Sequence, residues 1–271
     1  MSSEKYSRLN TVQIGLGIKE ATLKEFSCEE FDAFESTIDT KYFGVSSAKV
    51  ILKKAGLTEY RQKELLEFLQ NFEFIVITNK GNDSSNNHWL GEKTKAFLMD
   101  INIQLTKRVS ISEKSDDGFT IVADNFPENG QILEMAEGAF KFSRFLNDPY
   151  LPMQKAKSIY ADMAKNAFGK QGRFFVTIKG MEVVSGFLLF SINPGISSST
   201  IELIAIDQNF TGMGIGRSLI NAMEHHVAKM GIDAIRVGTQ LENINALKFY
   251  MSYDFSIVEC NSIYHYWPLK P

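Results

Sequence analysis

The sequence is poor in the residues that build disulfide frameworks and metal centres. Among its 271 residues are 2 cysteines, Cys28 and Cys260, and 4 histidines, none of them in a CxxC or HExxH pattern. Cysteines this far apart cannot form a disulfide framework, and alone they cannot complete a thiolate zinc site. We therefore expect a reducing, cytoplasmic compartment and no bound metal.

Long apolar runs and an excess of one charge are also missing. The longest apolar stretches, such as residues 187–190, have the length of a strand and not the ~20 residues that a membrane span needs. Residues 1–10 are polar and hold no apolar core of a signal peptide. With 29 basic and 32 acidic residues the net charge is −3, so the chain-wide positive field of a nucleic-acid-binding protein is absent. These features predict a soluble protein that acts on neither membranes nor nucleic acids.

What the chain does contain is typical of a folded α/β protein. Hydrophobic residues make up 44% and charged residues 23%, a balance that excludes a disordered chain. Two polar stretches, residues 79–95 and 110–118, lack apolar periodicity, and the first is typical of a surface loop. We place a domain boundary in the second stretch. This gives a smaller N-terminal α/β domain over residues 1–115 and a larger domain over residues 116–271.

Apolar periodicity predicts the helices and strands of both domains. In the N-terminal domain we expect a helix over residues 57–71, with Thr58 as its candidate N-cap, and strands over 48–53, 74–78 and 96–105. From about residue 120 the expected order is strand, helix, helix, three strands, helix, strand, helix, strand, which is a mixed sheet with antiparallel strands in its middle. The expected helices cover residues 130–142, 152–168, 216–230 and 243–250. The expected strands cover residues 173–178, 183–192, 200–206 and 234–238, with a closing hairpin at 255–260 and 263–267.

The most specific local feature is a glycine-rich segment between a predicted strand and a predicted helix. Glycines let consecutive backbone N–H groups converge on one point without obstruction by a Cβ atom. A helix N-terminus adds unpaired N–H donors and a partial positive charge. The segment is therefore a candidate cradle for a phosphate or pyrophosphate, and its arginine adds a formal charge. It reads Phe210-Thr211-Gly212-Met213-Gly214-Ile215-Gly216-Arg217.

The glycines have other interpretations. A dinucleotide-binding fold needs GxGxxG near the start of a repeated βαβ unit, whereas these glycines follow predicted antiparallel strands late in the chain. A P-loop is excluded because the GK[ST] sequence is missing. A tight strand-to-helix turn that binds no ligand is the remaining alternative.

A second motif follows on the next predicted helix, where Asn243, Ala246 and Tyr250 have the spacing N-x-x-A-x-x-x-Y. In this order and spacing the two motifs resemble the signature of the GNAT superfamily of acyl-CoA-dependent N-acetyltransferases, which is R/Q-x-x-G-x-G/A followed by N-x-x-A-x-x-x-Y. The resemblance covers about residues 120–267. Thr211 stands where the family usually has Arg or Gln, and Asp254 where a Gly-Phe pair commonly follows the tyrosine.

The resemblance implies a GNAT-type mixed central sheet flanked by helices, acetyl-CoA as the co-substrate, and transfer of acetyl to a primary amine. Backbone groups of residues 203–206 would face the pantetheine and the acetyl carbonyl, and the glycine segment would bind the pyrophosphate. Asn243 would hold CoA through its side-chain amide, although asparagine is also a favoured helix N-cap. The implied cofactor-binding residues are Leu203, Ile204, Ala205, Ile206, Thr211, Gly212, Met213, Gly214, Ile215, Gly216, Arg217, Asn243, Ala246 and Tyr250.

Two catalytic roles also come from the resemblance. It implies that Tyr250 is the general acid for the CoA thiolate, and a phenol with a reference pKa of ~10 is protonated at neutral pH. A tyrosine packed on a short amphipathic helix is the alternative. Glu202, in the strand beside the expected acyl site, is the first candidate for the general base, ahead of Asp39, Asp148 and His225. It could instead be a strand carboxylate that faces solvent or pairs with a lysine.

Residues 41–48, 142–145 and 236–240 resemble segments of the TDP-fucosamine acetyltransferases. These enzymes acetylate the amine of a nucleotide-linked 4-amino-4,6-dideoxy sugar and carry a degenerate GNAT-like α/β domain before the catalytic one. The resemblance implies a nucleotide sugar as the acceptor, a contribution of the N-terminal domain to its binding, and a homodimer. Aromatic side chains can stack on a sugar or base and an arginine can pair with phosphate, although a single phenylalanine is more often a core residue. The candidate acceptor-binding residues are Tyr42, Phe43, Ser143, Arg144 and Phe145.

Two other functions remain open from the sequence. One keeps the chemistry and changes the acceptor to a peptide amine, a polyamine or an antibiotic amine. An acidic acceptor surface would favour a polyamine or aminoglycoside, and a basic surface around Arg144 would favour a nucleotide sugar. The other is a regulatory module that binds CoA without catalysis, a reading that a positioned Tyr250 disfavours.

Overall fold

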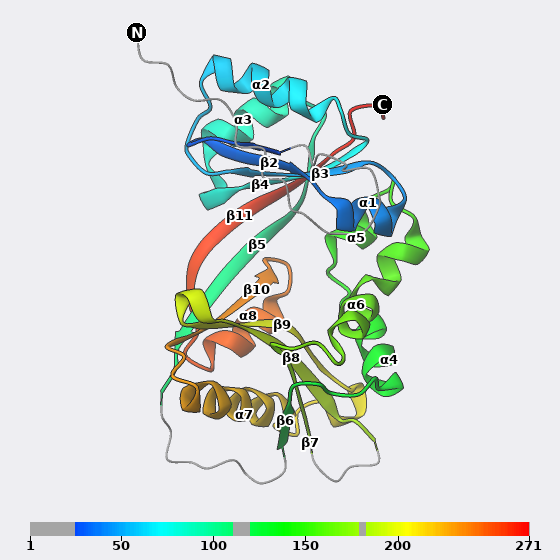
Figure 1. The fold of residues 1–271 in the computed structure, drawn as a ribbon, viewed down its shortest axis with the longest axis vertical. Helices are drawn as coiled ribbons and strands as arrows, with labels where there is room; N and C mark the ends of the chain where they lie inside the picture. Colours follow the sequence, from blue (N-terminus) through cyan, green and yellow to red (C-terminus); the bar gives the residue numbers. More distant parts are fainter. Residues whose placement is uncertain (1–24, 111–119, 179–182, 271) are drawn as a thin grey trace, which may run out of the picture. The chain divides into compact units, whose positions relative to one another are not determined.

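The computed structural model describes residues 25–110, 120–178 and 183–270, and these fall into two compact units (Figure 1). The first unit holds the described residues up to Ile101 and from Asn261 onward, and the second unit is Asn102–Cys260. The chain therefore divides near residue 101, whereas the sequence led us to expect a boundary near residue 115. Most of the polar stretch that suggested this boundary lies outside the described residues.

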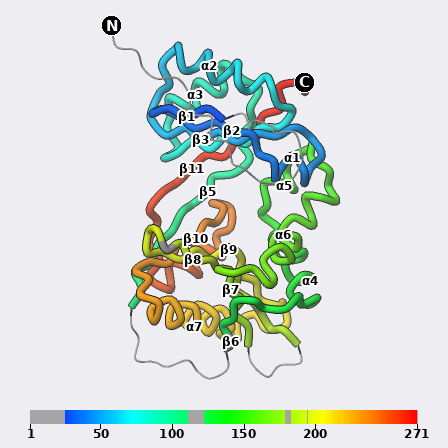
Figure 2. Tube along the Cα trace, viewed as in Figure 1, coloured from blue at the N-terminus to red at the C-terminus, as the bar shows by residue number. Residues whose placement is uncertain are grey.

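The first unit is built on a mixed sheet with the strand order β1-β2-β3-β4-β11, in which β3 and β4 are parallel. The strands β5 and β11 carry the chain between the units (Figure 2). The elements are β1 (Glu25–Ser27), β2 (Phe31–Glu35), α1 (Thr37–Phe43), β3 (Ser47–Leu52), α2 (Glu59–Leu69), β4 (Phe74–Asn79), the 3-10 turn η1 (Lys80–Asn82), α3 (Ser84–Lys93), the start of β5 (Phe97–Arg108) and the end of β11 (Ser256–Tyr266).

The second unit is built on a mixed sheet with the strand order β5-β10-β9-β8-β7-β6. Within the described residues β9 and β10 pair in parallel, and the other neighbouring strands pair antiparallel. This is the mixed sheet flanked by helices, with antiparallel strands in its middle, that the sequence predicts. The elements are β6 (Thr120–Ala123), α4 (Gly130–Ala139), α5 (Arg144–Asn147), α6 (Met153–Ala167), β7 (Arg173–Ile178), β8 (Gly186–Asn193), η2 (Pro194–Ile196), β9 (Ser198–Ile206), η3 (Gln208–Phe210), α7 (Ile215–Lys229), β10 (Ala234–Gln240) and α8 (Ile244–Met251).

Helices cover both faces of the second unit's sheet, and neighbouring residues of β8 point to different faces. Phe187 and Leu189 pack with Ile132 of α4 in one hydrophobic core. Phe190 points the other way, and its ring centroid lies 6.1 Å from that of His226 on α7. Because side chains of a strand alternate between faces, α4 and α7 lie on opposite sides of the sheet (Figure 1). His226 is half-buried on the face of α7 that packs against the sheet.

The prediction of a surface loop over residues 79–95 is wrong, because most of this segment forms α3. The Asp83 side chain accepts the N–H of Asn86 and caps the helix at 2.9 Å. Asn86 is buried, and its amide donates to Asn79 Oδ1 at 3.1 Å, while Trp89 supplies a buried apolar side chain. A buried asparagine is stable when its amide has partners, so polar composition alone did not exclude a packed helix here.

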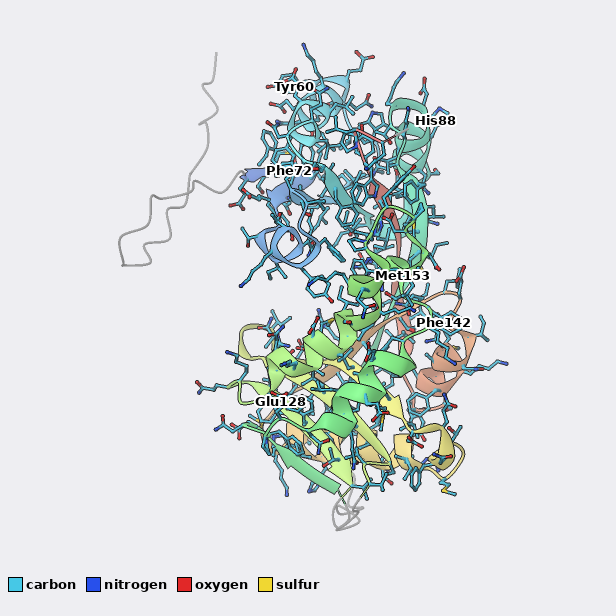
Figure 3. All side chains as sticks on the ribbon, turned by 90° about the vertical axis from the view of Figure 1, so that its right-hand side faces the viewer. Tyr60, Phe72, His88, Glu128, Phe142 and Met153 are labelled. Atoms are coloured by element: carbon cyan, nitrogen blue, oxygen red, sulfur yellow. The ribbon has the colours of Figure 1, made fainter. Side chains whose placement is uncertain are left out.

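Two further expectations are corrected by the structure. The closing hairpin around Asn261 and Ser262 is instead one continuous strand, β11. The helix expected to reach Phe142 ends at Ala139, and Phe142 is 42% exposed (Figure 3).

A nearly buried ion pair joins β5 to α7. Lys107 Nζ lies 2.5 Å from Glu224 Oε2, and the two side chains are 12% and 10% exposed. The other carboxylate oxygen accepts the backbone N–H of Ser110 at 3.1 Å and its hydroxyl at 3.2 Å. Removing one member of such a pair leaves an uncompensated buried charge, so the pair is costly to break.

We expect Glu224→Ala to lower the free energy of unfolding by about 3 kcal/mol, because the Lys107 ammonium is left buried and unpaired. Urea unfolding followed by circular dichroism measures this loss. The double variant Lys107→Met with Glu224→Leu removes both charges and should recover most of the stability. A double variant as unstable as Glu224→Ala would contradict this account of the pair.

Candidate active site

The parallel strands β9 and β10 separate from each other at the place where the acyl group is expected. Their pairing ends at Ile201 opposite Val237. Beyond this point β9 continues against β8 as far as Ile206, and β10 continues against β5 as far as Gln240. The N–H and C=O groups of residues 203–206 that point toward β10 therefore lie beyond its pairing with β9. Because buried backbone groups need a partner, these groups are available to a ligand.

A β-bulge in β9 lies directly at this separation. On β8, Leu189 is opposite Leu203, but its neighbour Phe190 is opposite Ile201. Glu202 is therefore the extra residue in β9. A bulge bends its strand and redirects side chains, which suits a strand that has to diverge from a parallel neighbour.

The Glu202 side chain is 14% exposed and forms an ion pair with the guanidinium of Arg173, the first residue of β7. The sequence left open a solvent-facing carboxylate or one paired with a lysine, and the partner in the structure is an arginine. The other acidic candidates have structural contacts. Asp39 lies in the first unit and pairs with Lys49 at 2.9 Å, and the Asp148 carboxylate accepts a backbone N–H at 2.8 Å.

The glycine segment after β9 leads into the N-terminus of α7 as expected. Gly212 has φ +83° and Gly214 has φ +80°, values that other residues rarely adopt. The N–H of Ser218 makes the first bond of α7, to the Gly214 carbonyl at 3.1 Å. The N–H groups of residues 215–217 therefore have no carbonyl of α7 to bond, and they form the positive end of the helix.

Gly216 has a different role from the two glycines before it. It is buried, and a Cβ atom there would lie 2.9 Å from two ring atoms of Phe249 on α8. The absence of a side chain thus lets α7 pack closely against α8. Packing, rather than backbone freedom, explains the third glycine of the motif.

The side chains of the glycine segment are arranged around the helix start. The Thr211 hydroxyl donates to the backbone carbonyl of Asp207 at 3.5 Å, and Met213 is exposed. Arg217 Nε donates to the Tyr253 hydroxyl at 3.0 Å, and its guanidinium lies 5.3 Å from the centre of that ring. Tyr253 therefore orients the arginine that could add charge to an anion site at the start of α7.

The second motif forms α8 as expected. Asn243 is the N-cap, and its side-chain oxygen accepts the N–H of Ala246 at 3.1 Å. Tyr250 is only 4% exposed, and its ring lies 5.4 Å from the rings of both Phe249 and Phe255. Burial raises the pKa of Tyr250, because it disfavours the phenolate. The phenol is therefore protonated at neutral pH and could act as a proton donor.

Two of the expected acceptor-binding residues lie in the first unit. Tyr42 and Phe43 are in α1, where their ring centroids are 5.0 Å apart. Phe43 is buried, and its ring lies 5.9 Å from that of Phe74 on β4. Phe43 is thus a core residue of its unit, while Tyr42 is half-buried.

The other three expected acceptor-binding residues lie together in the second unit, at α5. The Ser143 hydroxyl caps this helix by accepting the N–H of Phe145 at 3.3 Å. The Arg144 guanidinium lies 4.5 Å from the centre of the Phe145 ring, and its Nε atom is buried without a hydrogen-bond partner. An unpaired buried donor on a cation has a strong tendency to bind an anion.

A cleft of about 490 Å³ lies between α4 and the end of β9. Among the described residues that line it, the ionisable ones are Glu134 and Asp207, which are both acids. The sequence did not point to this cleft, which Met135 and Ala139 also line. Gly138 next to Ala139, one turn from a carboxylate, was the signal for an open helix face. The lining also includes Gln131, Gln208 and Asn209.

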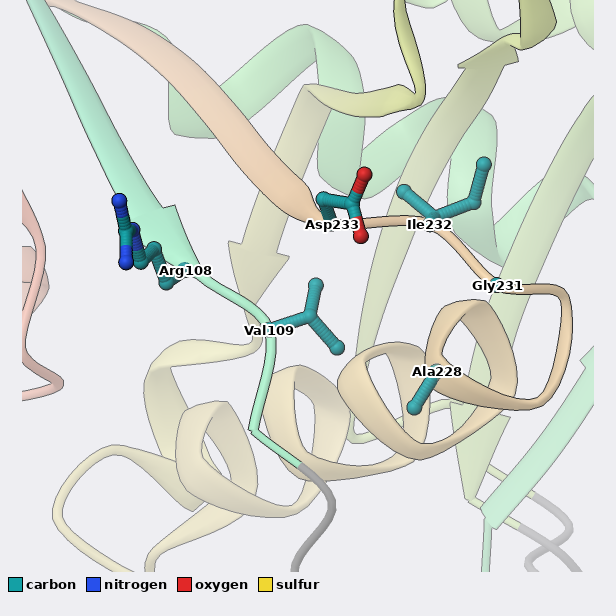
Figure 4. Close-up of a pocket in the computed structure, with 6 residues that line it drawn as sticks. All are labelled: Arg108, Val109, Ala228, Gly231, Ile232 and Asp233. Atoms are coloured by element: carbon teal, nitrogen blue, oxygen red, sulfur yellow. The ribbon is translucent and has the colours of Figure 1, made fainter.

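A second cavity, of about 530 Å³, lies at the C-terminal end of α7 (Figure 4). Arg108 and Asp233 line it together with the turn that follows the helix. It is at the opposite end of α7 from the glycine segment, and its lining includes no expected site residue. We therefore assign it no part in the site.

Neither a metal centre nor a membrane-spanning helix is present among the described residues. Within residues 25–110, 120–178 and 183–270, no group of three or more His, Cys, Asp or Glu side chains could hold a metal ion. Of the helices in these ranges, none combines the length and the apolar character needed to cross a bilayer.

Comparison with known proteins gives the family. Residues 114–255 match the Acetyltransferase (GNAT) family, so the chain belongs to this family and is an acyltransferase. The family uses acetyl-CoA as its acyl donor and acts on small-molecule acceptors. The chain is also 22% identical over 201 residues to the spore coat polysaccharide biosynthesis protein SpsD of Bacillus subtilis (strain 168), with 73% of this chain and 68% of SpsD covered.

Solved structures support the fold over most of the chain. A protein of unknown function from Staphylococcus epidermidis ATCC 12228 has a TM-score of 0.60 at 9% identity, with 91% of this chain and 95% of that chain covered. A GCN5-related N-acetyltransferase from Sphaerobacter thermophilus has a TM-score of 0.58 at 10% identity, with coverage of 87% and 76%. A tandem GNAT protein from the clavulanic acid biosynthesis pathway has a TM-score of 0.52 at 8% identity, with coverage of 91% and 86%.

We expect Gly216→Ala to lower the free energy of unfolding by about 1–3 kcal/mol, because the new methyl group collides with the Phe249 ring. The shift at the start of α7 should also weaken binding of CoA, measured by calorimetry. Gly138→Ala in α4 is the matched control, since a Cβ atom there meets nothing within 4 Å and alanine favours helix. Equal stability of the two variants would contradict the packing role of Gly216.

Proposed function

We propose that the enzyme transfers the acetyl group of acetyl-CoA to the primary amine of a nucleotide-linked amino sugar, of the TDP-4-amino-4,6-dideoxyhexose type. The observation that supports this choice of acceptor is the buried Nε atom of Arg144, which has no hydrogen-bond partner. The relative SpsD, a spore coat polysaccharide biosynthesis protein, supports a sugar-related acceptor.

Arg144 suits an acceptor that carries phosphate. A guanidinium holds a phosphate through parallel hydrogen bonds, and these are stronger where water is excluded. The stacking of Arg144 on Phe145 fixes the plane of the guanidinium before a ligand arrives. Preorganisation of this kind lowers the entropy that binding would otherwise cost.

The residues that would hold acetyl-CoA follow from the opening between β9 and β10. In this proposal the backbone groups of residues 203–206 bond the pantetheine, and the N–H groups at the start of α7 bond the pyrophosphate. Arg217, held by Tyr253, adds the positive charge there. The side-chain oxygen of Asn243 caps α8, which leaves its NH₂ group as the donor for CoA.

Two side chains would move the protons of the reaction. The amine must lose a proton as its nitrogen bonds the acetyl carbon, and Glu202 is the carboxylate nearest to the bulge that can accept it, directly or through water. As the carbon–sulfur bond breaks, the sulfur needs a proton, and the protonated phenol of Tyr250 supplies it. In this proposal Arg173 is a positioning residue that fixes the Glu202 carboxylate.

One observation favours a different acceptor. The charged residues that line the cleft beside α4, within the part of the chain that the structure describes, are the acids Glu134 and Asp207. A carboxylate pair of this kind attracts a cation, so a polyamine or an aminoglycoside is the second candidate. The Asp207 carboxylate also accepts the N–H of Asn209 at 2.8 Å, which fixes its position and leaves its charge in place.

We expect release of CoA thiol from acetyl-CoA with TDP-4-amino-4,6-dideoxygalactose, and none with polyamines, aminoglycosides or peptide amines. Arg144→Met should raise KM for the nucleotide sugar about tenfold or more, because the phosphate loses its partner. Arg144→Lys should recover part of the affinity, since it keeps the charge but not the fork of donors. Turnover of a polyamine or aminoglycoside alone would contradict the nucleotide-sugar acceptor.

We expect Tyr250→Phe to lower kcat about 100-fold while the Kd for CoA stays nearly the same, because the variant loses only a proton donor. Tyr253→Phe is the matched control and should weaken CoA binding more than it lowers kcat, since it releases Arg217. Because burial raises the pKa of Tyr250, the wild-type activity should show no alkaline limb from this residue below about pH 10. An alkaline limb of the activity profile below that pH, present in the wild type and lost in Tyr250→Phe, would be inconsistent with the burial of Tyr250.

A further inference from the structure

A row of polar residues crosses one face of the second unit's sheet. Neighbours in the strand register are Arg173 and Ser191, Ser191 and Thr200, Thr200 and Arg236, and Arg236 and Thr106. Residues opposite one another in register point to the same face of a sheet. The row therefore runs without an apolar residue from β7 to β5.

The polar row continues into an open surface on β10 and β5. Gly238 is opposite Gln104, and Gln240 is opposite Asn102, on the same face as Arg236. Gly238 is exposed, and a Cβ atom there would lie 2.7 Å from Gln104 Nε2. Gln104 donates in turn to the Asn102 side chain. We call Arg236, Gly238, Gln104 and Asn102 the polar platform.

The polar platform flanks the point where β9 and β10 separate. Arg236 precedes Val237, the last residue of β10 in register with β9. Glu202 faces the same side of the sheet, because its carboxylate pairs with Arg173 of the polar row. The carboxylate, the exposed arginine and the opening between the strands are thus on one face.

The other face of the same strands is closed. Val237, Ile235 and Leu105 are buried there. Phe190, in line with Val237 through Ile201, contacts α7 on that side. An acceptor that has to reach a thioester held between β9 and β10 can therefore approach from the polar face but not through this core.

We infer that the polar platform binds the acceptor, with Arg236 paired to one phosphate of its diphosphate while Arg144 holds the other, and with the amides of Gln104 and Asn102 bonded to its hydroxyl or carbonyl groups. This inference rests on the proposed function, since it takes the acceptor to be a nucleotide sugar. Arg236 is exposed and cationic, so it complements an anionic acceptor and repels a polyamine. Gly238 keeps the space above the amides free.

The experiment compares Arg236→Met with Arg108→Met. Both arginines are exposed, both lie on the β5–β10 pair, and both changes remove one positive charge. With TDP-4-amino-4,6-dideoxygalactose as acceptor, Arg236→Met should raise KM for the sugar about tenfold, with kcat and KM for acetyl-CoA within about twofold. Arg108→Met should leave all three constants within about twofold. Inhibition by TDP should weaken in parallel in Arg236→Met alone.

A second pair of variants tests the amides. Gly238→Ala should displace the Gln104 side chain, and Gln104→Ala should remove it, so both should raise KM for the acceptor and leave the Kd for CoA unchanged. Unchanged acceptor KM in Arg236→Met, or equal effects of Arg236→Met and Arg108→Met, would overturn the inference while the proposed function stands. If the wild type acetylates only another amine, the proposed function and the phosphate role of Arg236 both fail. In that case Gly238→Ala and Gln104→Ala are assayed with the amine that is acetylated, and a raised KM for that amine shows that the platform binds the acceptor.

Discussion

The separation of two parallel strands after Ile201 and Val237 is the constraint on which the site depends. A strand that loses its neighbour inside a sheet exposes backbone donors and acceptors, and these are stable only with another partner. The bulge at Glu202 lies at this point, and the strand then leads through the glycine segment into α7. One short stretch of chain thus holds both the open strand edge and the positive helix terminus to which we propose that acetyl-CoA binds.

The first unit shows what happens without this separation. It has the same order of strand, helix and parallel strand, in β3, α2 and β4. There the pairing is unbroken from Ser47 opposite Phe74 to Leu52 opposite Asn79. The helix start is capped by its own Thr58 side chain, which accepts an N–H at 3.4 Å. Because the backbone groups of this parallel pair are bonded to each other along its whole length, we attribute acyl transfer to the second unit.

Local sequence patterns predicted most elements of the second unit, fewer of the first unit, and no strand register. The strand at residues 173–178 and the helix beginning near Gly216 are confirmed within a residue, because their apolar periodicity and glycine boundaries are local signals. The helix α3 was missed because its asparagines are stabilised by partners elsewhere in the fold. The residues of both GNAT motifs were found, but the bulge at Glu202, its arginine partner and the face of Arg236 depend on strand register. Register is set by contacts between distant segments, so no window of sequence contains it.

Hydrogen–deuterium exchange with and without CoA tests the central claim most directly. If CoA lies between the diverging strands, its binding should slow exchange at the amides of residues 203–206 and 214–217. The amides of β10 that are already paired with β9, up to Val237, should change little. Unchanged exchange at residues 203–206 and at residues 214–217 in saturating CoA would contradict the account.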